Sequence, residues 1–115
     1  MKQEYYTEER CHILEYHNTP DDPAISVARA RVEPGITTKW HAVSGTEERY
    51  VVLEGRGYAE VGESGPQMLA TGDHLLIPAG APQRISNQGD SDLIFLCICT
   101  PRFEWDNYQS LEPAD

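Results

Sequence analysis

Turn-forming residues interrupt this sequence at intervals of about eight to twelve residues, and this spacing limits the folds open to the chain. The turn signals are rich in Gly, Pro, Asn and Asp and lie at residues 18–23, 34–35, 44–45, 54–55, 62–66, 71–73, 78–80 and 87–90. Between them are runs that favour β-strands, the clearest at 25–32, 49–53, 57–61, 74–77, 84–87 and 93–100. Short strands separated in this way are typical of an all-β sandwich or barrel. We therefore predict a single, closed, antiparallel all-β domain over residues 1–115.

The charge of the chain argues against two kinds of partner. Nine Lys plus Arg stand against nineteen Asp plus Glu, which gives a formal net charge of −10 over 115 residues. Phosphate groups are bound by clustered positive charge, so we expect no nucleic-acid partner and no membrane partner. Residues 1–6 contain no apolar stretch of signal-peptide length, and the three cysteines have no secretory context. These features predict a cytoplasmic protein with reduced thiols.

The stretch over residues 35–55 contains residue types that carry chemistry. Side chains alternate between the two faces of a strand. If residues 44–45 form a two-residue turn, His41 stands directly opposite Glu48 in a hairpin, with Cβ atoms about 4.5–5.5 Å apart. An imidazole and a carboxylate at that separation can form a hydrogen bond or share a metal ion. A longer turn would shift this register, and the apolar pattern leaves open whether Glu48 faces the inside of the barrel.

Two longer patterns include these residues. Residues 35–55 read G-x5-H-x-V-x4-E-x6-G, and residues 72–87 read G-x5-P-x-G-x2-Q-x3-N. They resemble the two motifs of the cupin family, which carry a second His where this chain has Val43 and a His where it has Gln83. The motifs and their spacer cover roughly half of the chain. The resemblance implies a jelly-roll, or double-stranded β-helix.

The resemblance also implies a metal site. In metal-binding cupins the ligands are the two His and the Glu of the first motif and the His of the second. Here His41 and Glu48 keep a ligand of the family type, Val43 offers no ligand atom, and Gln83 offers a neutral amide oxygen. We expect His41, Glu48 and Gln83 to hold a divalent metal (Zn, Mn, Fe or Ni) more weakly than an intact cupin site does.

Three functions follow from this reading. The leading hypothesis is a small intracellular cupin that binds a divalent metal and a small organic ligand, as an isomerase, cyclase or oxygenase of unknown substrate. The altered positions also fit a metal-free binding module for a small molecule such as a carbohydrate. The third hypothesis is a metal-free enzyme in which His41 and Glu48 form an acid–base dyad and Tyr50 is the proton donor. Glu48 and Tyr50 are thus the candidate catalytic residues, and the sequence does not decide whether the chain is an enzyme.

Two expectations concern the outside of the barrel. Residues 101–115 are polar apart from aromatic side chains at Phe103, Trp105 and Tyr108, and we expect this tail to pack on the barrel. The strand at residues 50–53 is apolar on both faces. Together with the resemblance, that pattern implies a homodimer through the outer sheet.

Overall fold

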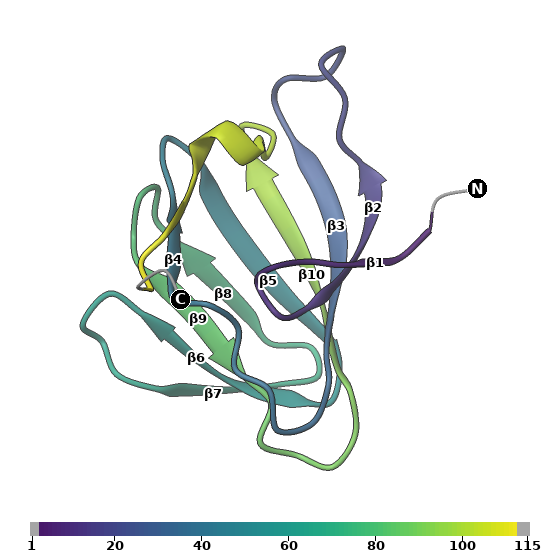
Figure 1. The fold of residues 1–115 in the computed structure, drawn as a ribbon, viewed down its shortest axis with the longest axis vertical. Helices are drawn as coiled ribbons and strands as arrows, with labels where there is room; N and C mark the ends of the chain where they lie inside the picture. The colour runs from purple at the N-terminus through teal and green to yellow at the C-terminus, as the bar shows by residue number, and fades with distance from the viewer. Residues whose placement is uncertain (1–2, 113–115) are drawn as a thin grey trace.

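The computed structural model describes residues 3–112, and within them the chain forms two antiparallel sheets that face each other (Figure 1). The larger sheet contains, in spatial order, β1 (Tyr5–Tyr6), β2 (His12–His17), β3 (Ser26–Val32), β10 (Leu93–Thr100), β5 (Glu47–Glu54) and β8 (His74–Ile77). The smaller sheet contains β11 (Tyr108–Ser110), β4 (His41–Val43), β9 (Gln83–Ser86), β6 (Arg56–Val61) and β7 (Gln67–Ala70). Consecutive strands such as β4 and β5 lie in different sheets. This is the predicted jelly-roll, and the all-β fold class is confirmed.

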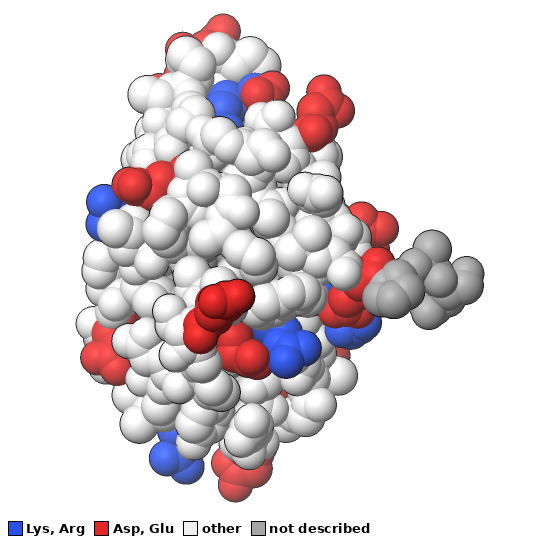
Figure 2. Space-filling model, turned by 90° about the vertical axis from the view of Figure 1, so that its left-hand side faces the viewer, with Lys and Arg blue, Asp and Glu red and all other residues white. Residues whose placement is uncertain are grey.

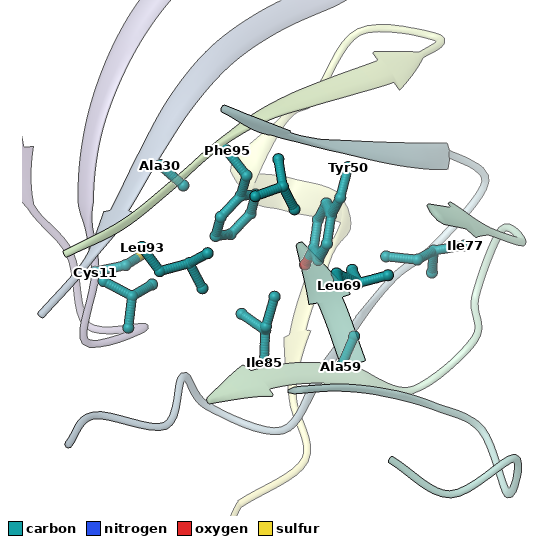
Figure 3. Close-up of a cluster of buried hydrophobic side chains, with 11 residues drawn as sticks. Cys11, Ala30, Tyr50, Ala59, Leu69, Ile77, Ile85, Leu93 and Phe95 are labelled. Atoms are coloured by element: carbon teal, nitrogen blue, oxygen red, sulfur yellow. The ribbon is translucent and has the colours of Figure 1, made fainter. Parts of the chain in front are cut away.

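The hydrophobic core fills the space between the two sheets (Figure 3). The longest pairing joins β10 to β3 and β5, which supply Phe95, Ala30 and Tyr50 from the larger sheet. The smaller sheet contributes Ile85 of β9 and Leu69 of β7, both almost completely buried. Side chains alternate between the two faces of a strand, and along β5 every second residue from Glu48 to Val52 is buried while the residues between them are half-buried.

The predicted hairpin between His41 and Glu48 is wrong. β4 pairs with β9 and β11, whereas β5 pairs with β10 and β8. The turn after Val43 carries the chain from one sheet to the other, because the backbone groups at this end of β4 bond elsewhere. The carbonyl of Val43 accepts from the Gly80 amide at 3.0 Å, and the amide of Ser44 donates to the Asn107 carbonyl at 2.9 Å.

Residues 101–112 fold back across the barrel (Figure 1). A single 3-10 turn, η1 (Trp105–Asn107), leads into β11, which pairs with β4 so that Ser110 lies opposite His41. The segment is fastened at its end by Glu112. The carboxylate of Glu112 accepts from the Trp40 amide at 2.7 Å and from Arg10 at 2.6 Å. The two ends of the chain are thereby joined over one side of the barrel.

The surface is acidic, with its basic side chains mostly paired. On the face in Figure 2, most Lys and Arg side chains lie beside Asp or Glu, and no continuous basic patch forms among the described residues drawn there. Examples are Arg31 with Glu4 at 2.7 Å and Arg84 with Glu60 at 2.8 Å. Within residues 3–112, no helix has the length and apolar character that crossing a membrane would need.

Candidate functional site

A cavity lies between the two sheets and is the natural candidate for a binding site. The space open to the centres of water molecules is about 70 Å³, whereas a single water needs roughly 10–15 Å³ on the same measure. The cavity can therefore take several waters or one small organic molecule. The exposed surface of its walls is mainly apolar, and its polar members are Tyr5, Glu9, Glu15, Asn18, Ser26, Thr38, His41, Glu48 and Tyr50, with three cysteines. Gln83 is not a lining residue but bonds to two of them.

A chain of hydrogen bonds crosses the polar end of the cavity. The Tyr50 hydroxyl of β5 donates to Oε1 of Gln83 at 2.5 Å. The amide nitrogen of Gln83, on β9 in the opposite sheet, donates to Oε1 of Glu48 at 2.9 Å. All three side chains are buried, with exposed fractions of 4%, 2% and 8%. The structure thus brings Tyr50, Gln83 and Glu48 together, and each of them forms a side-chain hydrogen bond with another member of the set.

His41 reaches the same cavity from the smaller sheet, but its ring contacts different groups. Nδ1 donates to the Lys39 carbonyl at 2.6 Å, and Nε2 lies 3.2 Å from a carboxylate oxygen of Glu9. The ring also stacks on Tyr108, with centroids 5.2 Å apart. His41 and Gln83 are directly paired residues of β4 and β9. His41 and Glu48 therefore line one cavity from two sheets, without the hairpin contact that the sequence suggested.

Glu9 is the site residue that the sequence analysis missed. It lies in the segment before β2, outside both motif regions. A turn closes this segment, with the Thr7 amide donating to the Cys11 carbonyl at 2.9 Å, and the Lys39 amide donates to the Glu9 carbonyl at 3.2 Å. These contacts hold the Glu9 side chain against His41, where it is 15% exposed. No local pattern in the polar N-terminal segment predicts that one of its glutamates turns inward.

Two carboxyl groups of the cavity, those of Glu9 and Glu48, hold their protons more tightly than usual. Burial, with a smaller contribution from Glu8, raises the pKa of Glu9 from 4.5 to about 7. Burial and the neighbouring Glu9 raise the pKa of Glu48 to about 6, although His41, Gln83 and Cys97 act in the opposite direction. Desolvation disfavours the charged form of a carboxyl, which is why both shifts have the same sign. A protonated Glu9 can donate its proton to Nε2 of His41.

We expect these two groups to make the protein less stable as the pH rises from about 4.5 to about 7. Their pKa is higher in the folded than in the unfolded chain, so the fold binds protons more tightly and is favoured below this window. Urea unfolding of the wild type and of Glu9→Gln across the window measures the effect. The loss of stability should be smaller in Glu9→Gln, by on the order of a few kcal/mol. Parallel pH profiles for the two proteins would contradict the assignment, and Glu63→Gln, an exposed carboxyl, is the control.

Burial also makes Tyr50 and the three cysteines of the cavity poor proton donors and nucleophiles at neutral pH. Desolvation, reinforced by the Glu48 charge, raises the pKa of Tyr50 and of Cys97 well above the ordinary values. The pKa values of Cys11 and Cys99 are shifted upward for the same main reason. The thiols are therefore neutral core side chains, and thiolate chemistry has no support in this cavity.

The donor atoms around the cavity do not fit a divalent metal as they are arranged. The Gln83 oxygen, the only ligand atom of that side chain, accepts from Tyr50, and one Glu48 oxygen accepts from Gln83. Nε2 of His41 faces Glu9, and Val43 supplies no donor. Among residues 3–112, no three His, Cys, Asp or Glu side chains lie close enough together to hold a metal ion. Metal binding by His41, Glu48 and Gln83 stays a prediction.

Comparison with known sequences gives a consistent picture. The family model described as "Cupin domain" matches residues 28–99, which contain most of β3 and of β10 and every strand between them. An uncharacterized protein of Methanocaldococcus jannaschii, MJ1618, is 33% identical over 87 residues, covering 76% of this chain and 69% of that protein.

Solved structures share the fold. The protein TT1209 from Thermus thermophilus superposes with a TM-score of 0.73 at 27% identity, over 86% of this chain and 90% of that one. An oxalate decarboxylase from Lactobacillus farciminis, determined as a formate complex, superposes with a TM-score of 0.81 at 24% identity, over 96% of this chain. This chain spans only 33% of that decarboxylase, so the likeness concerns one barrel of a longer protein.

Proposed function

This chain belongs to the cupin domain family, and we propose that it binds a small organic molecule in its barrel cavity without the help of a divalent metal. The observation that carries the proposal is the chain of hydrogen bonds from Tyr50 through Gln83 to Glu48. Buried polar groups that satisfy one another are stable without an ion, so this arrangement needs no metal to compensate it. The cavity with its apolar walls then remains open to a ligand.

The charge of the lining restricts the class of ligand. None of the described residues that line the cavity is Lys or Arg, and three of them are Glu. An anion would have to give up its hydration without gaining a positive partner, which is costly in a buried site. This disfavours carboxylate ligands such as the formate in the oxalate decarboxylase complex. We propose a neutral or positively charged molecule.

Binding can be tested on protein treated with a chelator. We expect a small uncharged probe such as propan-1-ol, or a charged one such as propylammonium, to shift the amide resonances of cavity residues in a saturable way. Ala28 lines the cavity and Ala79 is exposed, so Ala28→Leu should abolish this binding and Ala79→Leu should preserve it. Probe binding that requires added Zn²⁺, Mn²⁺, Fe²⁺ or Ni²⁺ would contradict the metal-free proposal.

Acid–base catalysis on the bound molecule is a second candidate, favoured by two carboxyls whose pKa lies near neutrality. In such an enzyme, Glu48 transfers the proton and Glu9 and His41 lie beside it. Tyr50 orients Gln83 through their hydrogen bond. Tyr50 would make a poor proton donor because its pKa is raised further above the neutral range. Glu48→Gln would then abolish turnover and leave the binding of an uncharged probe such as propan-1-ol intact, whereas a binding module would show no turnover to lose.

The oligomeric state is a separate proposal. We infer from the family resemblance that two chains associate through the larger sheet, whose outer side exposes Leu53 and Leu76. Light scattering at micromolar concentration should give the mass of a dimer, and the mass of one chain would contradict this.

A further inference from the structure

We propose that the ligand of the cavity is a small organic cation of the alkylammonium class, whose charge is met by the carboxylates of Glu9 and Glu48. This inference rests on the proposed metal-free binding function and names its substrate class. It depends on three independent features of the cavity, namely its negative groups, the positions of the arginines around it and the character of its walls.

The two carboxylates reach the cavity from different parts of the chain. Glu48 extends from β5 and is 8% exposed, and Glu9 extends from the segment before β2 and is 15% exposed. One Glu9 oxygen lies 3.2 Å from Nε2 of His41. Glu9 and Glu48 both line the cavity, so a ligand bound there lies within reach of two carboxyl groups.

Positive side chains near the cavity are turned away from it. Arg29 and Arg31 of β3 pair with Glu4 at 3.5 and 2.7 Å on the outer side of the larger sheet. Arg10, only one residue after Glu9, pairs with Glu112 at 2.6 Å. A buried carboxylate is stable only with a compensating charge or hydrogen-bond donor. An ammonium group supplies both the positive charge and several N–H donors.

The walls suit the carbon part of such a ligand. Aliphatic and aromatic side chains of both sheets surround the polar end, among them Ile13, Ile85 and Phe95. Phe103 and Trp105 of the C-terminal segment also line the cavity, with ring centroids 4.9 Å apart. Aromatic faces attract cations, so these rings favour an ammonium over a neutral or anionic molecule of the same size. The cavity volume limits the ligand to a few heavy atoms.

A matched set of probes tests the charge preference directly. Propylammonium, propan-1-ol and propionate share a carbon chain and differ in charge. Each is titrated into chelator-treated, isotopically labelled protein at constant ionic strength and at a pH above the pKa of Glu9, about 7, so that Glu9 and Glu48 are ionised. We expect propylammonium to bind at least about tenfold more tightly than propan-1-ol, because hydrogen bonds to charged groups are the stronger ones, and propionate not to bind. Glu9→Gln and Glu48→Gln should each weaken propylammonium binding at least about fivefold and leave propan-1-ol unaffected. Glu63→Gln, which removes an exposed carboxylate, should change neither.

The outcomes separate this inference from the function on which it rests. Equal affinities for propylammonium and propan-1-ol, unchanged by Glu9→Gln, would overturn the cation inference and leave the binding function standing. A complete lack of saturable binding by all three probes would contradict the binding function itself. Urea unfolding of each variant identifies any loss of fold. If Glu48→Gln is unfolded, Glu9→Gln still decides, because Glu9 lies outside the chain of hydrogen bonds that joins Tyr50, Gln83 and Glu48.

Discussion

If the wild type binds no metal, as we propose, Gln83→His should create a metal site in the cavity. Residue 83 is the direct neighbour of His41 across the β4–β9 pair, so their Cβ atoms are about 4.5–5.5 Å apart. A second imidazole beside His41 and Glu48 forms a set of two histidines and one carboxylate, which binds divalent transition metals. The substitution also removes the amide that ties Tyr50 to Glu48.

The expected gain is large because a direct ligand is added. Loss of groups that merely support a ligand changes metal affinity by about 10–100-fold, so we expect at least about a 100-fold gain here. Titration with Co²⁺, followed by visible absorption, measures affinity and coordination together. Gln88→His places the same residue on the exposed surface and should leave the affinity unchanged. Equal Co²⁺ affinity in the wild type and in Gln83→His would show that Gln83 already acts as a ligand or that position 83 is not part of the site.

Gly55→Ala should be the most destabilising of the simple glycine substitutions. Gly55 has φ of +76°, and an added Cβ would lie 2.7 Å from the backbone oxygen of Asp92. The left-handed conformation costs a residue with a side chain about 1–2 kcal/mol, and overpacking against backbone adds about 1–3 kcal/mol. We therefore expect the free energy of unfolding to fall by roughly 2–5 kcal/mol.

Gly45→Ala separates the two contributions. Gly45 has a similar φ of +71°, but an added Cβ would meet nothing within 4 Å. Its substitution should cost only the conformational part, about 1–2 kcal/mol. Denaturant unfolding of both variants gives the comparison, and equal losses would mean that the turn at Gly55 relaxes away from Asp92.

The fold could be predicted from the sequence because its signals are local. Gly55 and Gly72 mark corners where the backbone adopts positive φ, and small apolar residues alternate with arginines along β3, with Ala30 and Val32 in the core. The spacing of such turns, with strands between them, indicates an all-β sandwich or barrel, and the resemblance of the two motifs to those of cupins implies the jelly-roll. These features depend on backbone geometry and on side-chain alternation, which neighbouring residues in the sequence largely determine.

The contacts of the site could not be predicted in the same way because they join distant segments. The turn at 44–45 is compatible with a hairpin, and only the bonds of β4 to β9 and β11 make it a crossover between sheets. Glu9 enters the cavity from a polar segment without a motif. The use of the Gln83 oxygen by Tyr50 depends on two strands of opposite sheets. The identity of residue 83 alone does not distinguish a glutamine that binds a metal from one that forms hydrogen bonds to its neighbours.

The metal content of the purified protein tests the central claim most directly. Wild type and His41→Ala are prepared without a chelator and without an affinity column that carries metal, and both are analysed before and after incubation with Zn²⁺, Mn²⁺, Fe²⁺ and Ni²⁺. The metal-free account predicts far less than one metal per chain in both proteins, even after incubation. Near-stoichiometric metal in the wild type that is lost in His41→Ala would contradict it and would identify His41 as a ligand.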